Sequence, residues 1–182
     1  MTETVMSIDL KQDFFALFGL PRRFELDEAT LARAYHDLQG EVHPDRYAHL
    51  PDADKRRAMQ WATRVNEGLQ TLKKPLNRAI YLLQLAGIDP ALETNTAMSS
   101  EFLMEQMQWR EELEEARSAG DADELHHLHE RLRQQGRDML AELRCALDER
   151  HDLHAAAEIV RRLMFIDKLQ NQIDDALEAL ED

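Results

Sequence analysis

The sequence predicts an all-α protein in two parts: a unit of shorter helices, then a bundle of three long ones. Apolar residues recur at spacings of three and four over most of the 182 residues, which is the helical period. All five prolines lie at or before Pro90, which leaves 92 residues free of that helix breaker. The length suits one or two compact units and excludes a large multidomain enzyme. We expect residues 1–86 to form the first unit, residues 87–97 a linker and residues 98–182 the bundle.

Charge and composition exclude several classes of protein. Residues 1–86 carry 12 basic and 12 acidic side chains and residues 87–182 carry 10 and 24, so the second part holds the whole net charge of −14. Phosphate binding needs basic patches, so we expect no nucleic acid partner. The longest window without charge, Ala79–Ile88, is too short for a membrane span, so we expect no membrane partner. The single cysteine, Cys145, allows neither an internal disulfide nor a cysteine-rich zinc site, which favours a reducing cytoplasm as the location. We expect the protein to bind neither a metal nor a cofactor.

An antiparallel pair of helices dominates the predicted first unit. Asp27 can cap the first helix, whose apolar face consists of Leu31, Tyr35, Leu38 and Val42. The second helix follows Pro51, and its apolar face consists of Ala58, Ala62, Val65, Leu69 and Leu72. The two faces can pack together with residues 43–50 as the turn. Short helices over residues 13–18 and 77–86 flank this pair.

Each of the three long helices predicted for the second unit has one apolar stripe. The first begins near Ser99 or Ser100 and ends before Gly120, the second is capped by Asp121, and the third covers about residues 152–180. The stripes consist of Met98, Phe102, Trp109, Leu113 and Ala116, of Leu125, Leu128, Leu132, Met139, Leu143 and Leu147, and of Ile159, Leu163, Ile166, Ile173 and Leu177. Three such stripes facing one another make a three-helix bundle.

The tripeptide His43-Pro44-Asp45 exceeds what packing requires. His43 precedes a proline, which disfavours helical backbone, so the helix should end there and the following residues should form an exposed connection. Loops held out by a rigid scaffold are common recognition sites. The plain alternative is a helix stop followed by a polar turn. A catalytic acid–base pair is a third possibility, but such pairs occupy pockets that shift their pKa values, and a solvent-facing turn has none.

A second feature lies on the first helix of the bundle. At 100° per residue, Leu103, Met104 and Met107 point away from the core stripe. The same face carries Gln108, Glu111 and Glu115. An apolar patch flanked by carboxylates suits protein docking, and Phe165 of the third helix can join it if the two helices are neighbours. The alternative is that the bundle packs both faces of this helix, with Leu103 and Met107 buried against the first unit.

Several segments together resemble one known family. They are LFGLP at residues 17–21, HPD at 43–45 and VNEGLQTLKKPLNRAIYLL from Val65. Two more are FLMEQMQWREELEE from Phe102 and VRRLMFIDKL from Val160. With these segments the chain resembles the HscB co-chaperones of iron–sulfur cluster assembly, which combine a J-domain with a C-terminal bundle. A generic J-protein would lack the C-terminal segments, and an unrelated helical bundle would lack HPD.

The resemblance implies a co-chaperone without enzymatic activity of its own. Such a protein stimulates ATP hydrolysis by a DnaK-like partner, HscA, and delivers to it the scaffold protein IscU. The contact with the ATPase would carry over to His43, Pro44, Asp45, Arg46 and Arg33. The helix before the turn is less basic than is usual in the family, because it contains Asp37, Gly40 and Glu41.

The scaffold contact implied by the resemblance falls on the apolar patch. The matching positions are Leu103, Met104, Met107, Gln108, Glu111, Glu115 and Phe165. Gln108 stands where the family usually has a glutamate, so one charge is lost. The alternative function is a J-protein, or an acidic helical adaptor, with a different client.

Overall fold

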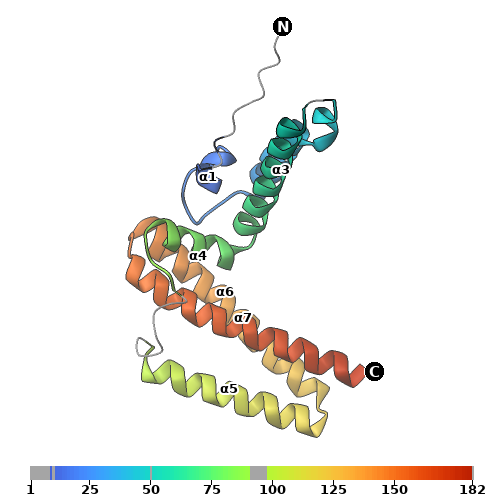
Figure 1. The fold of residues 1–182 in the computed structure, drawn as a ribbon. Coiled ribbons are helices and arrows are strands. Elements are labelled where there is room, and N and C mark those ends of the chain that lie inside the picture. The colour runs from blue at the N-terminus through green and yellow to red at the C-terminus, as the bar shows by residue number, and fades with distance from the viewer. Residues whose placement is uncertain (1–8, 10, 50, 91–97, 182) are drawn as a thin grey trace. The chain divides into compact units, whose positions relative to one another are not determined.

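The computed structural model describes residue 9 and residues 11–49, 51–90 and 98–181, and this part of the chain contains helices and no strand (Figure 1). It separates into two compact units, Met1–Leu82 and Leu83–Asp182. The predicted all-α class, a helical hairpin followed by a bundle, is confirmed. Residues 91–97, most of the predicted linker, lie outside the described residues, and the predicted domain boundaries stay a prediction. No described helix combines the length and hydrophobicity that a membrane span needs.

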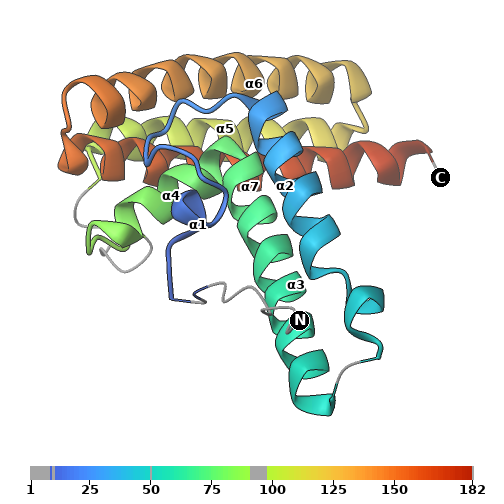
Figure 2. The same cartoon turned by 90° about the horizontal axis from the view of Figure 1, so that it is seen from above.

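The hairpin of the first unit consists of α2 (Glu28–Val42) and α3 (Asp52–Lys73), which lie side by side (Figure 2). A 3-10 turn, η1 (Pro44–Tyr47), follows α2. Asp27 caps α2 as predicted, because its carboxylate accepts the N–H groups of Ala29 and Thr30. The buried side chains of the pair are Leu31, Val42, Ala58, Trp61, Val65 and Leu72. The other predicted stripe residues, Tyr35, Leu38, Ala62 and Leu69, are half-buried.

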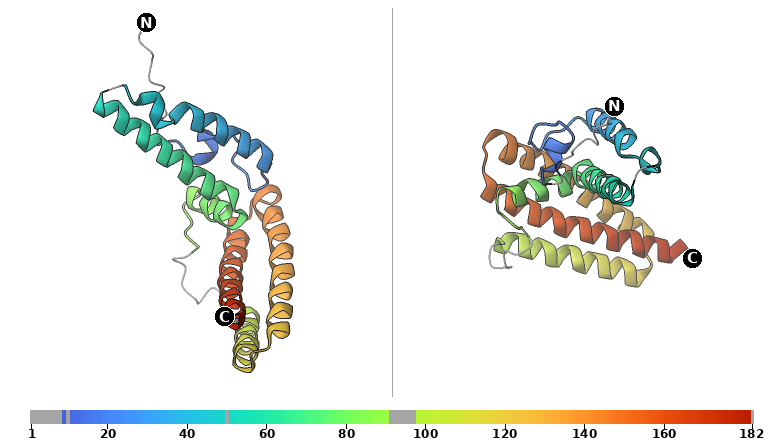
Figure 3. Two further views of the ribbon diagram at one scale, coloured as in Figure 1. Left: turned by 90° about the vertical axis from the view of Figure 1, so that its right-hand side faces the viewer. Right: turned by 45° about the horizontal axis from the view of Figure 1, so that its top comes forward.

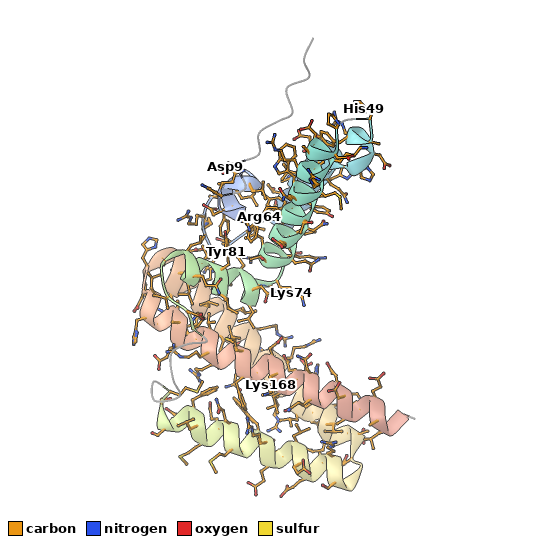
Figure 4. The ribbon with its side chains drawn as sticks, viewed as in Figure 1. Asp9, His49, Arg64, Lys74, Tyr81 and Lys168 are labelled. Atoms are coloured by element: carbon orange, nitrogen blue, oxygen red, sulfur yellow. The ribbon has the colours of Figure 1, made fainter. Side chains whose placement is uncertain are left out.

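Two short helices, α1 (Phe14–Leu17) and α4 (Pro75–Leu85), complete the hairpin's core. The Tyr81 ring lies 4.9 Å from that of Phe14, and its hydroxyl accepts the Phe14 N–H at 3.0 Å (Figure 4). Helix α4 begins two residues earlier than predicted, because proline is favoured in the first turn, where its missing N–H has no helical partner.

The second unit contains the predicted three long helices: α5 (Ser100–Ala119), α6 (Ala122–Arg144) and α7 (Leu153–Glu181) (Figure 3). Ser99 and Asp121 cap α5 and α6, and Gly120 ends α5 with a φ of 64°. The predicted stripe residues are buried, apart from Met98 and Leu177, which are half-buried. Each stripe therefore faces the common core of the bundle.

Helix α6 ends in a wider turn than the sequence predicts. A π turn, η3 (Cys145–Glu149), follows Arg144 and packs against α7. At 100° per residue, Cys145 lies opposite the apolar stripe of α6, which predicts an exposed side chain. The residue is instead half-buried, and its thiol donates a hydrogen bond to the Glu149 carboxylate at 3.3 Å. This hydrogen bond raises the pKa of the Cys145 thiol. The helical phase does not disclose this contact, because Glu149 belongs to the π turn that follows α6.

Candidate functional site

The turn after α2 is a compact 3-10 structure. His43 ends the helix with φ −57° and ψ 127°, the extended ψ expected before a proline. The Arg46 N–H donates to the His43 carbonyl at 3.0 Å, and the Ala48 N–H donates to the Asp45 carbonyl at 3.4 Å. The predicted exposed connection thus has a defined backbone.

Two side chains of the turn hold it against the hairpin. The Tyr47 hydroxyl donates to the Glu41 carbonyl at 2.7 Å, and the Arg46 guanidinium donates to the Gly40 carbonyl at 3.1 Å. Both carbonyls lie in the last turn of α2, where helical partners are missing. The Tyr47 ring also packs edge-on against Trp61 of α3, with the ring centroids 6.4 Å apart. Sequence reasoning missed this anchor, although an aromatic residue shortly after the tripeptide was the available signal.

His43 and Asp45 are presented to solvent as separate groups. Their side chains are 53% and 90% exposed. The Asp45 N–H donates to Nδ1 of His43 at 3.3 Å, so Nδ1 is the acceptor in this hydrogen bond. The Asp45 carboxylate lies 3.6 Å from the same nitrogen, beyond hydrogen-bonding distance. An exposed imidazole and carboxylate of this kind suit contact with a partner and do not suit proton transfer in a pocket.

The structure does not bring Arg33 to the turn. Its guanidinium donates to the Thr30 hydroxyl at 3.0 Å and lies 4.0 Å from the Asp27 carboxylate, at the start of α2. Ten residues separate Arg33 from His43, which is about 15 Å along a helix. Of the two arginines assigned to the ATPase contact, only Arg46 belongs to the turn.

The apolar side chains predicted to leave the core of α5 are exposed. The exposed fractions are 38% for Leu103, 71% for Met104 and 72% for Met107. Gln108, Glu111 and Glu115 are exposed as well. We refer to these six residues as the Leu/Met patch. Within the second unit, the other helices of the bundle do not bury Leu103 or Met107.

Phe165 lies where α7 meets α5. Its ring stacks on that of Trp109 at 6.2 Å and meets that of Phe102 edge-on at 6.0 Å. The Arg110 guanidinium lies 5.3 Å above the same ring. The half-buried Phe165 therefore connects the aromatic core of the bundle to the surface of α5. The sequence argument placed Phe165 near the patch but missed Arg110.

Neither surface contains a ligand set for a metal. Within the described ranges, no three His, Cys, Asp or Glu side chains come together as a metal site. Ion pairs of histidine do occur, such as that between Nε2 of His129 and the Asp174 carboxylate at 3.4 Å.

Comparison with known proteins identifies the family of the chain. A family model described as the HSCB C-terminal oligomerisation domain matches residues 98–174. A co-chaperone protein HscB homolog from Aromatoleum aromaticum is 70% identical, over 97% of this chain and 99% of its own. The chain belongs to the HscB co-chaperone family. An HscB homolog from Chromobacterium violaceum is 56% identical, over 97% of this chain and 100% of its own.

Solved HscB structures have the same fold. Chaperone HscB from Vibrio cholerae is 39% identical with a TM-score of 0.81, over 93% of this chain and 99% of its own. Human co-chaperone protein HscB is 29% identical with a TM-score of 0.84, over 92% of this chain and 83% of its own. As a member of the HscB family, this chain is a J-type co-chaperone of iron–sulfur cluster assembly and not an enzyme. The family works in general with an Hsp70-type chaperone and a scaffold protein.

Proposed function

We propose that the chain binds an IscU-type scaffold protein and delivers it to an HscA-type, DnaK-like ATPase, whose ATP hydrolysis it stimulates. One observation carries this proposal: the chain exposes two unlike surfaces, a polar turn in one unit and an apolar helix face in the other. The ATPase contact consists of His43, Pro44, Asp45 and Arg46, with Arg33 further along α2. The scaffold contact consists of the Leu/Met patch and Phe165. The single Cys145 favours a reducing cytoplasm for this assembly.

The geometry of the turn supports the ATPase contact. Tyr47 and Arg46 hold the backbone through hydrogen bonds to α2, so the turn has little conformational freedom to lose when it binds. The side chains of His43 and Asp45 are exposed, so they are accessible to a partner and contribute little to the packing of the hairpin. An ordered loop with exposed polar groups is the arrangement that recognition sites commonly have.

The exposure of the Leu/Met patch supports the scaffold contact. Met104 and Met107 are more than two-thirds exposed, and burying such side chains against a partner is favourable. Methionine is flexible and fits irregular partner surfaces. Glu111 and Glu115 border the apolar residues, so the part of the scaffold that faces them should be basic. The uncharged Gln108 should reduce electrostatic steering more than affinity.

Covalent connection of the two surfaces supports delivery. A scaffold bound to one unit meets the ATPase bound to the other at an effective concentration in the mM range for a short linker. Separate encounters at low micromolar concentrations cannot match that. Scaffold and co-chaperone should therefore stimulate the ATPase together more than either does alone.

Steady-state ATP turnover by the HscA-type ATPase tests the proposal. The intact chain should stimulate turnover, and adding the scaffold should raise it further. A His43→Gln chain mixed with a Leu103→Ala/Met107→Ala chain supplies both surfaces on separate molecules. At equal low micromolar concentrations this mixture should lose the joint effect. Equal rates for the mixture and the intact chain would contradict delivery, and patch variants that still bind the scaffold would indicate a different client.

A further inference from the structure

A groove between α5 and α7 borders the Leu/Met patch. Its volume is about 730 Å³, and it is a groove open to solvent along one side and not an enclosed pocket. The buried Leu113 and Ala176 line it, and Lys168 of α7 lies on its wall (Figure 4). Its other charged and polar lining residues are Arg110, Glu114, Arg117, Gln172 and Asp175.

The basic residues of this groove are unusual in their domain. Residues 98–182 contain 10 basic and 22 acidic side chains. Several of the basic ones form ion pairs, among them Arg131, Arg133, Arg137, Arg144 and Arg162. Arg110, Arg117 and Lys168 have no described carboxylate within 4.0 Å, although Glu114 and Asp175 line the same groove. Three cations that form no direct ion pair are thus concentrated in one groove of an acidic domain, where they outnumber the two carboxylates of the same groove.

The groove continues the proposed scaffold contact. Arg110 follows Met107 by three residues, so the two side chains are neighbours on the surface of α5. The guanidinium of Arg110 also lies above the Phe165 ring. A protein that covers Met107 and Phe165 and extends along α5 towards Arg117 therefore enters the groove.

We propose that the groove holds an acidic, extended segment of the scaffold protein that docks on the Leu/Met patch. Arg110, Arg117 and Lys168 pair with carboxylates of that segment. This inference rests on the proposed function and adds a second electrostatic element to the same contact. Glu111 and Glu115 favour basic groups on one side, whereas the groove favours acidic groups on the other. Opposite charges at two places fix the orientation of a partner, because the reversed orientation brings like charges together.

Zero-length cross-linking tests which molecule occupies the groove. A carbodiimide condenses the Lys168 amine with a carboxylate in contact with it into an amide and takes up the water that is lost. In a mixture of the intact chain and an IscU-type scaffold, mass spectrometry should find Lys168 joined to an aspartate or glutamate of the scaffold. The Lys168→Arg variant should retain full affinity and lose this cross-link. A cross-link from Lys168 to a second copy of this chain would overturn the proposal in favour of self-association.

Charge reversal tests the contribution of the groove to binding. Arg117→Glu/Lys168→Glu should weaken scaffold binding roughly tenfold, and added salt should reduce the difference from the wild type. Arg133→Glu is the matched control, because Arg133 is an exposed arginine of α6 outside the groove, and its effect should stay within about twofold. If the groove variant bound the scaffold with wild-type affinity while Leu103→Ala/Met107→Ala weakened binding, the groove proposal alone would be overturned. Unchanged affinity of both variants would overturn the proposed function too.

Discussion

The turn of the first unit and the Leu/Met patch of the second are held in place by different means. The turn lies within residues 43–47, and backbone groups together with Tyr47 and Arg46 fix its shape. The patch projects from a helix whose opposite face is core, so the exposed Leu103 directly follows Phe102, which is 1% exposed. We therefore predict that changes to the exposed side chains of the turn reduce function without loss of stability. On α5, by contrast, a proposed binding residue and a core residue are direct neighbours in the sequence.

The largest expected effect is on the turn. His43→Gln or Asp45→Asn should abolish stimulation of the HscA-type ATPase and leave thermal stability within about 0.5 kcal/mol, because both side chains are exposed. Steady-state ATP turnover measures the loss of stimulation, and thermal unfolding measures the unchanged stability.

Tyr47→Phe is a contrasting variant for the same turn. It removes the hydroxyl that donates to the Glu41 carbonyl, so it should cost about 1 kcal/mol of stability. If His43→Gln kept full stimulation, the turn would not be the ATPase contact. If it destabilised the protein as much as Tyr47→Phe, His43 would belong to the fold.

The core side of α5 should respond in the opposite way. Trp109 is 9% exposed and packs against the rings of Phe102 and Phe165. Trp109→Ala should therefore destabilise the second unit by about 3–5 kcal/mol in a denaturant titration. Met107→Ala, two residues away but 72% exposed, should change stability by no more than about 0.5 kcal/mol. Equal destabilisation by the two variants would show that the two faces of α5 are not distinct.

Substitutions in the Leu/Met patch should act on binding. Leu103→Ala, Met104→Ala and Met107→Ala should each weaken scaffold binding, the most central by about 2 kcal/mol, or roughly 30-fold. Isothermal titration calorimetry measures this effect. Phe165→Ala should lower both affinity and stability, because its ring contacts two core aromatics. A Leu103→Ala variant with unchanged affinity and the low stability of Trp109→Ala would assign Leu103 to the core.

The two surfaces also differ in how far the sequence predicts them. The turn is a contiguous motif that ends one amphipathic helix and precedes another, so its place in the hairpin follows from local rules. The patch depends on the helical phase over residues 103–115, which holds because α5 is regular from Ser99 to Gly120. At Cys145 the phase predicts more exposure than the structure has, because Glu149 of the following π turn contacts the thiol.

Contacts between distant segments were beyond the sequence argument. The Tyr47–Trp61 contact joins residues 14 apart, and the groove joins α5 to α7 across about 60 residues. Gly68 is a third case, since a Cβ atom built there would lie 2.6 Å from the Phe18 ring. The residue pattern of one helix does not predict which side chain of another element packs against it. Contacts of this kind are therefore known only from the folded structure.

Stiffening the helix before the turn should have a modest effect. Gly40 lies inside α2, and a Cβ atom added there would meet no atom within 4 Å, so Gly40→Ala should raise stability by about 0.5–1 kcal/mol through helix propensity. ATPase stimulation should not change, because the turn keeps its own hydrogen bonds. Gly68→Ala is the control, and it should destabilise by about 1–3 kcal/mol because of the clash with Phe18. A Gly40→Ala variant with reduced stimulation would show that the ATPase contact needs flexibility in α2.

The smallest expected effect is the acid response of the first unit. Burial would raise the pKa of Asp13, but hydrogen bonds from Arg22 at 2.5 Å and from the Ala16 N–H outweigh it, so this pKa is below its ordinary value. A depressed native pKa adds stability above the pKa of the unfolded chain, and this stability is lost as pH falls through the native pKa, below about pH 4.

Asp13→Asn removes this acid response while keeping a side chain that can cap α1. Its unfolding free energy should therefore fall less steeply between about pH 4 and pH 2 than that of the wild type. The two tryptophans allow the units to be followed separately, because Trp61 belongs to the first and Trp109 to the second. In a Trp109→Phe background, Trp61 fluorescence reports urea unfolding of the first unit alone. Scaffold binding at neutral pH should be the same in both proteins, since the Leu/Met patch belongs to the other unit. Identical pH slopes of the unfolding free energy for the wild type and the Asp13→Asn variant would mean that the Arg22 contact does not persist in solution.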